Sequence, residues 1–214
     1  MIDPTQPGAV TTLTSSLGTN PNGVAFDGSR IWTANNSGSV SIVSLNPISV
    51  STVSTGFNFH LGMLYDGANI WVTDFSVRTL LKLNADGTIA QTITVGNTPC
   101  YPVFDGTNIW VPNRGSNSVS VVRVKDAVGN PLASAFVLAT LTGNGLNQCF
   151  TAAFDGERIL VTNIGNNRVS LWKAADLTPL GSFATGAGSS PRGACSDGLN
   201  FWITLNTTDK LARF

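Results

Sequence analysis

Few side chains in this chain of 214 residues could carry out acid–base or nucleophilic chemistry. The sequence has one histidine, His60, and one glutamate, Glu157. Glycoside hydrolysis by acid–base catalysis needs two carboxyl groups on either side of one bond, and Glu157 lies in a predicted Asp-Gly-Glu turn with no carboxylate to pair with. A nucleophile also needs an adjacent base, which Cys100 beside His60 would provide. The sequence therefore predicts no catalytic residue, with a lyase- or hydrolase-like enzyme centred on His60 as the alternative.

The three cysteines, Cys100, Cys149 and Cys195, give little sign of metal chemistry. There is no C-x-x-C pair, and zinc sites built from cysteine and histidine need more than one histidine here. We therefore expect no metal and no cofactor. Cys100 and Cys149 lie one register apart at the crossovers into successive repeats, so the sequence leaves open whether they form a disulfide or two buried thiols, whereas Cys195 is expected to be free.

The sequence contains one motif that recurs five times. An aromatic residue or serine, Asp-Gly and a β-rich stretch recur as "FDGSRIWTA", "YDGANIWVT", "FDGTNIWVP", "FDGERILVT" and "SDGLNFWIT". Asp-Gly between apolar runs is a strong signal for a β-hairpin, because both residues tolerate positive φ. The turn aspartates are Asp27, Asp66, Asp105, Asp155 and Asp197, spaced 39, 39, 50 and 42 residues apart.

Each repeat contains enough sequence for four short strands, and no segment has a helical period. Four strands every 40 residues or so are typical of a β-propeller blade. The 17 residues after Asp197 and the 26 before Asp27 together make one blade length, 43 residues. The sequence therefore predicts an all-β chain, 1–214, forming one domain: a five-bladed propeller of four-stranded antiparallel blades. A strand within residues 1–18 would complete the last blade, so that one N-terminal and three C-terminal strands close the ring.

The segments "IWVTDFSVRTLLKL", "IWVPNRGSNSVSVV" and "ILVTNIGNNRVSLW" resemble the YVTN repeats of bacterial and archaeal propellers, which are related to NHL repeats. The resemblance covers nearly the whole chain and implies a propeller fold. It implies no single function, since such propellers serve as surface proteins, binding modules and, in one branch, lyases. Pro112 departs from the repeat and is expected to end its strand, because proline has no N–H for the ladder.

Residues that recur in every repeat are expected to serve the fold. Four tryptophans lie five residues after a turn aspartate and should fill the space between neighbouring blades, since Leu160 takes the same position in repeat four. The turn aspartates lack the second acid of a calcium loop and should only shape the turn.

Residues that differ at matched positions are the functional candidates. They gather in the crossovers between repeats and in the loops after each second strand. This face carries five cations and two acids, Asp74 and Asp209, and the excess of positive charge favours an anionic group. The predicted binding residues are His60, Tyr101, Arg114, Arg168 and Arg192.

The composition also limits the classes of partner that the protein could bind. Only 11% of residues are charged and the net charge is zero, which disfavours nucleic acid. No apolar run is long enough for a membrane span, and no signal peptide is visible. The sequence thus predicts a non-catalytic recognition or scaffold module whose partner is an anionic glycan or peptide, with a structural cell-surface element as another alternative. Composition points to a bacterial exterior, while the location and host stay open.

Overall fold

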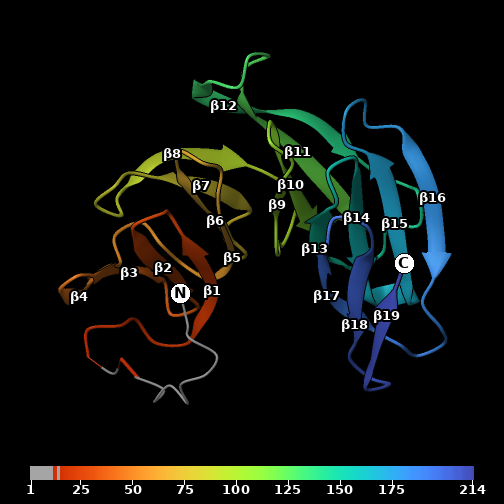
Figure 1. The fold of residues 1–214 in the computed structure, drawn as a ribbon, viewed down its shortest axis with the longest axis horizontal. Helices are drawn as coiled ribbons and strands as arrows, with labels where there is room; N and C mark the ends of the chain where they lie inside the picture. The colour runs from red at the N-terminus through yellow and green to blue at the C-terminus, as the bar shows by residue number, and fades with distance from the viewer. Residues whose placement is uncertain (1–11, 14) are drawn as a thin grey trace.

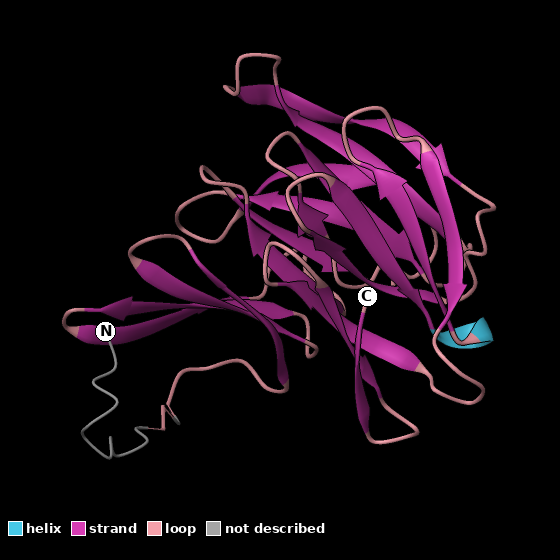
Figure 2. Ribbon diagram, turned by 45° about the vertical axis from the view of Figure 1, so that its right-hand side comes forward, coloured by secondary structure: helices cyan, strands magenta, loops and turns pink. Residues whose placement is uncertain are grey.

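The computed structural model of the protein describes residues 12–13 and 15–214 and is built almost entirely from β-strands (Figures 1 and 2). Five antiparallel sheets follow one another along the chain, and each sheet is one blade. The blades are arranged as in a five-bladed β-propeller, which confirms the predicted fold class. The short 3-10 turn η1 (Ile164–Asn166) is the helical element of the described chain, within which no helix could cross a membrane.

Strands within a blade pair in chain order, from the innermost to the outermost. Blade one comprises β1 (Pro21–Phe26), β2 (Arg30–Asn35), β3 (Ser39–Leu45) and β4 (Ile48–Val53). Blade two comprises β5 (His60–Tyr65), β6 (Ile70–Asp74), β7 (Thr79–Leu83) and β8 (Ile89–Thr94). Blade three comprises β9 (Val103–Phe104), β10 (Asn108–Asn113), β11 (Ser118–Lys125) and β12 (Pro131–Leu141). Blade four comprises β13 (Cys149–Phe154), β14 (Arg158–Asn163), β15 (Arg168–Lys173) and β16 (Pro179–Ala184), and blade five comprises β17 (Pro191–Ser196), β18 (Phe201–Leu205) and β19 (Lys210–Arg213).

The Asp-Gly hairpin joins the first and second strands of every blade. In blade one, Gly28 has a φ of 95°, and the Asp27 carboxylate accepts hydrogen bonds from the backbone N–H groups of Ser29 and Arg30. The other carboxylate oxygen accepts the indole N–H of Trp32 at 2.8 Å. The aspartate therefore does more than the sequence predicts: it shapes the turn and also fixes the tryptophan.

The core lies between the blades, and the predicted wedge role is confirmed for Trp32, Trp71 and Trp110 but not for Trp202, which is partly exposed. Trp32 is 1% exposed and packs against Ile70 and Val72 of blade two. Trp71 packs in the same way against blade three, and Leu160 packs against blade five. Burial of such large apolar side chains stabilises the packing of neighbouring blades.

The innermost strands lie side by side from β1 to β17, so each blade contacts the next. The described part of the N-terminal segment runs along blade one: the Gly18 N–H donates to the Ser41 hydroxyl, and the Thr52 hydroxyl donates to the Ser16 carbonyl. The prediction that this segment completes blade five is therefore wrong for residues 15–18, which bond to blade one because the Ser41 and Thr52 hydroxyls lie beside them, while residues 1–11 and 14 lie outside the described residues. Within the described chain, blade five has three strands, and Figure 1 shows a gap between blade five and blade one.

The expectation that Pro112 ends its strand is wrong. β10 continues to Asn113, with Pro112 opposite Val119. The Pro112 carbonyl accepts a hydrogen bond from the Cys100 N–H. Proline can therefore take part in the sheet through its carbonyl, although it has no N–H to donate.

Candidate binding site at the centre of the arc

The single histidine does not lie in an open mouth. His60 begins β5, and its side chain is 0% exposed. Its Nε2 lies 3.3 Å from Oδ2 of Asp74, which is also 0% exposed, and its ring meets Phe57 edge-on at 5.0 Å. The sequence predicts that His60 lines the mouth, but its ring is sealed from solvent by strands and loops of blades one and two.

Asp74 receives an unusual number of hydrogen bonds for a buried carboxylate. Burial opposes its ionisation, but the close contact with His60 and hydrogen bonds from the Phe59 N–H and the Ser76 hydroxyl outweigh burial and lower its pKa to about 2. In blades one, three and four the matched residue is asparagine, whose amide donates to serine hydroxyls of the third strand: Asn35, Asn113 and Asn163. The His60–Asp74 pair therefore replaces a neutral structural network with a charged one.

The cysteines are all free, as the sequence predicts for Cys195. Cys100 and Cys149 are fully buried, and burial raises the pKa of each thiol to about 12. A nucleophilic cysteine needs a lowered pKa, so Cys100 has the opposite environment from the one that catalysis would require.

A small cavity lies where the crossovers into blades three, four and five meet. Its volume is about 360 Å³, and its lining is Tyr101, Phe150, Thr151, Arg192, Gly193 and Ala194. The rings of Tyr101 and Phe150 meet at an angle of 62° with centroids 5.1 Å apart, and the Arg192 guanidinium carbon lies 5.5 Å from the Phe150 centroid. Arginine over an aromatic face is a favourable cation–π contact that also orients the guanidinium.

The electrostatics of this cavity suit an anion. Arg192 is exposed, and within the described residues no acidic side chain pairs with it. The Tyr101 hydroxyl hydrogen-bonds to the side-chain oxygen of Asn22, and burial raises the pKa of Tyr101. Tyr101 therefore stays neutral beside Arg192, with its single O–H donated to Asn22.

The other predicted binding residues lie elsewhere. Arg114 lines a separate hollow of about 430 Å³ with Phe75, Thr98 and Gln148. Arg168 is held within blade four, where its guanidinium donates to the hydroxyl and the carbonyl of Ser182 at 2.9 and 2.6 Å. The structure thus brings together Tyr101 and Arg192 of the five. Phe150 was missed, although it occupies the same crossover position as Arg192 one blade earlier.

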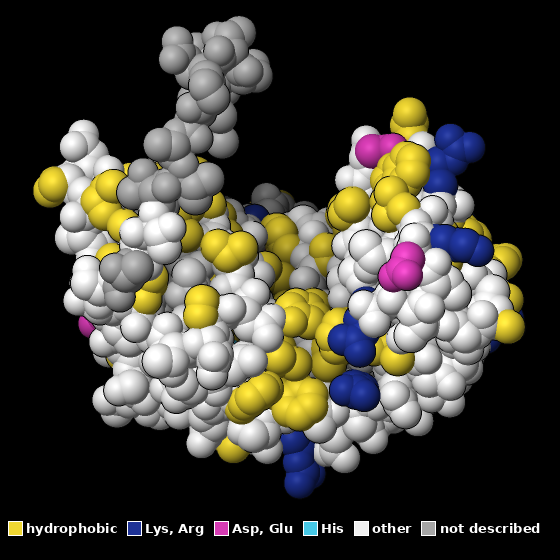
Figure 3. Space-filling model, turned by 90° about the horizontal axis from the view of Figure 1, so that it is seen from below, with side chains coloured by type: hydrophobic (Ala, Val, Ile, Leu, Met, Phe, Trp, Pro, Cys, Tyr) yellow, Lys and Arg dark blue, Asp and Glu magenta, His cyan; other side chains and the backbone are white. Residues whose placement is uncertain are grey.

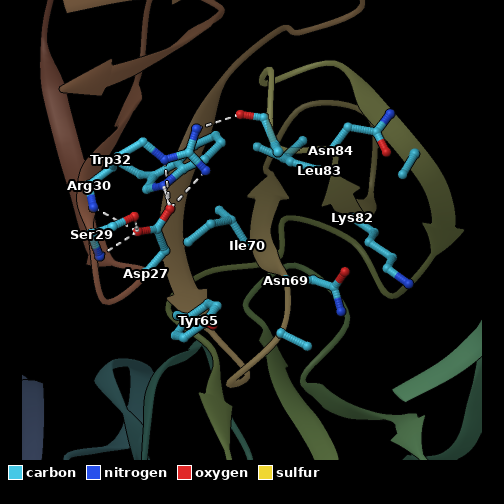
Figure 4. A pocket seen from close by; sticks show the side chains of 13 residues that line it. Asp27, Ser29, Arg30, Trp32, Tyr65, Asn69, Ile70, Lys82, Leu83 and Asn84 are labelled. Carbon is cyan, nitrogen blue, oxygen red and sulfur yellow. Dashed lines mark hydrogen bonds and ion pairs between the residues drawn. The ribbon is translucent and has the colours of Figure 1, made fainter. Parts of the chain in front are cut away.

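A further cavity of about 530 Å³ lies away from this centre, between blades one and two (Figure 4). Its wall includes Asp27, whose carboxylate is already bonded to Arg30 and Trp32, and Lys82 points along its far side. A similar hollow of about 310 Å³ surrounds Asp105 between blades three and four. Because the hollow recurs with the repeat, it belongs to the blade packing. Within the described residues no group of three or more His, Cys, Asp or Glu is placed to hold a metal.

Comparison with solved structures finds other propellers. The chain superposes on hydrazine synthase of Kuenenia stuttgartiensis with a TM-score of 0.72 and 17% identity, over 92% of this chain and 58% of that one. It matches virginiamycin B lyase from Staphylococcus aureus with a TM-score of 0.66 and 16% identity, over 92% of this chain and 70% of the lyase. A chain of a nidogen–laminin complex matches with a TM-score of 0.64 and 17% identity, over 91% and 75% of the two chains. The likeness is one of fold. No family model and no curated protein matches the sequence.

Proposed function

We propose that this protein is a non-catalytic recognition module of the YVTN/NHL-like kind, which binds an anionic group at the Tyr101–Phe150–Arg192 cavity. The observation that carries the proposal is Arg192: an exposed guanidinium stacked on an aromatic ring and free of any acidic partner in the described chain. A guanidinium offers two parallel N–H donors to a carboxylate, and stacking on Phe150 reduces the entropy lost on binding.

The two aromatic rings define the rest of the ligand. Tyr101 and Phe150 supply apolar walls beside the Arg192 guanidinium. A carboxylate attached to a flat apolar or sugar surface fits this combination. The ligand class we favour is therefore an acidic glycan or a short acidic peptide.

The alternative is a lyase- or hydrolase-like enzyme, and one structural neighbour is a lyase. In this chain the only histidine is buried against Asp74 and serves the packing of blade two. Catalysis through His60 would require the crossover at residues 54–59 to open, and burial of the imidazole favours the binding module instead. A purely structural surface element is the third possibility, and it predicts no ligand at the cavity.

The test begins with a screen of sialylated, uronate-containing and neutral glycans and of acidic peptides, followed by calorimetric titration of the best binder. Arg192→Ala should weaken binding by about 1.5–3 kcal/mol, the range for a charged hydrogen bond. The matched control is Arg168→Ala, which removes the same charge from blade four and should leave the affinity unchanged.

Arg192→Lys separates charge from geometry. Lysine keeps the charge but lacks the two-pronged donor, so we expect it to recover only part of the affinity. If Arg192→Ala binds as tightly as the parent at low salt, the cavity is not the binding site.

A further inference from the structure

Every interface between successive blades uses two defined faces. We call the face that contacts the next blade the trailing face and the face that contacts the preceding blade the leading face. In blade two the trailing face carries Leu64, Trp71 and Leu80, which pack against Ile109 and Val111 of blade three. The leading face of blade two carries Met63, Tyr65, Ile70 and Val72, which pack against Trp32 of blade one.

At two of the interfaces, a threonine on the trailing face also donates a hydrogen bond to the next blade. The Thr73 hydroxyl accepts the Gly62 N–H of its own blade at 2.9 Å and donates to the Cys100 carbonyl of the next blade at 2.8 Å. Thr162 repeats this in blade four: it accepts the Thr151 N–H and donates to the Arg192 carbonyl at 2.8 Å. The threonine thus ties the second strand of one blade to the innermost strand of the next.

Blade five has the same trailing face, and no described residue of another blade packs against it. Trp202 donates its indole N–H to Asp197 at 2.8 Å, as the other tryptophans do to their turn aspartates, but it is partly exposed. Leu211, matched to the fully buried Leu80, is 62% exposed, and Cys195 beside Trp202 is also exposed. Thr204 accepts the Gly193 N–H at 2.9 Å, yet its hydroxyl reaches only the carbonyl of Gly193 in its own blade, at 3.4 Å.

At the other end of the arc, the leading face of blade one has no preceding blade against it among the described residues. Val24 is 65% exposed where the matched Met63 is 9% exposed, and Phe26, matched to Tyr65, is 51% exposed. Figure 3 looks into the molecule from below the view of Figure 1 and shows a hollow between the two ends, with apolar side chains gathered in it. Large apolar side chains on two facing surfaces are a sign of an interface that lacks its partner.

We propose that these two faces are docking surfaces for further blades of the same repeat, which would fill the gap between blade five and blade one. These faces continue the pattern of the interfaces between successive blades. The trailing face of blade five carries Trp202, Leu211 and the Thr204 hydroxyl, and the matched residues of blade two contact the next blade. The occupant must present aliphatic side chains to Trp202 and Leu211 and a backbone carbonyl of an innermost strand to Thr204. A single added strand would pair at the outer edge of β19 and leave this face uncovered.

The experiment extends the protein with blades that it already contains. A second copy of residues 54–142, blades two and three, is fused after Phe214, with the copied Cys100 replaced by alanine. Cys195 reports docking, because it is exposed on the trailing face while the native Cys100 and Cys149 are buried. Reaction of Cys195 with a thiol reagent should slow by at least about tenfold in the extended protein, since the interface must open first.

Leu211→Glu is the matched control variant. A charge at this exposed position should be tolerated in the unextended protein, but in the extended protein it should prevent docking and restore fast labelling of Cys195. The proposal is overturned if the added blades fold, as measured by circular dichroism, and Cys195 reacts at the original rate. It is also overturned if the unextended protein self-associates in light scattering with Cys195 protected, because the occupant would then be a second copy.

Discussion

Blades two and five contain the same hairpin but lie in different surroundings. In both, an aspartate at the turn accepts the indole N–H of a tryptophan five residues later, at 2.7 Å in blade two and 2.8 Å in blade five. Trp71 is 1% exposed beneath blade three, whereas Trp202 has no blade over it within the described chain. The hairpin geometry is therefore local and survives without the neighbour, while burial of the ring depends on the next blade.

This difference separates two contributions to stability that are joined in every interior blade. The turn and its indole bond need only one repeat, but the hydrophobic contribution needs two. Substitutions at matched positions in the two blades measure the contributions separately.

The largest difference is expected at the tryptophans. Trp71→Ala should lower the free energy of unfolding by about 3–5 kcal/mol, because it leaves a cavity between two packed sheets. Trp202→Ala should cost about 1–2 kcal/mol, since the ring already contacts solvent. Urea denaturation followed by circular dichroism measures both, and equal losses would mean that blade five is covered in solution.

A smaller difference is expected at the turn aspartates. Asp66→Ala leaves the buried indole N–H of Trp71 and two backbone N–H groups without an acceptor, at a cost of about 2–3 kcal/mol. Asp197→Ala should cost less, because water can replace the carboxylate at an exposed turn. The comparison fails if Asp197→Ala is the more damaging of the two.

The His60–Asp74 pair of blade two should make the stability of the protein depend on pH in the acidic range. The pKa of Asp74 is about 2 in the folded protein and about 3.9 in an unfolded chain, so the carboxylate stabilises the fold above pH 4. This contribution, about 2 kcal/mol, is lost as the pH falls from 4 to 2. Asp74→Asn, which copies the residue of blades one, three and four, should flatten the stability curve in that range. A variant with the parent's acid sensitivity would show that other carboxylates dominate.

The smallest effect is expected at the thiols. Cys195→Ser should change the free energy of unfolding by less than about 0.5 kcal/mol, as is usual for an exposed position. In the native protein one thiol should react quickly, and all three should react after denaturation. A count of one free thiol in the denatured, unreduced protein would contradict the buried thiols seen here.

The repeat could be predicted from sequence because each hairpin has its own local signal: Asp-Gly, a β-rich stretch and a tryptophan at fixed spacing. The burial of His60 could not be predicted from sequence, because it depends on contacts with Phe57 and Asp74. Phe57 lies in a crossover and Asp74 at the end of a strand, so no local signal joins them. Arg168 was misplaced for a similar reason, because its guanidinium finds Ser182 on the adjacent strand. Tyr101 and Arg192 could be predicted together because both lie close before a turn aspartate, at positions that differ between the repeats.

The bond between Tyr101 and Asn22 has a mechanical consequence. Asn22 belongs to the innermost strand of blade one, and Tyr101 directly precedes that of blade three, so the bond spans the width of blade two as a chord spans an arc. Three blades joined pairwise and also tied at their ends form a braced triangle, which resists changes in curvature far better than a hinged row. Blades four and five have no such brace to blade one in the described chain. We therefore expect the bond to oppose widening of the arc formed by the first three blades.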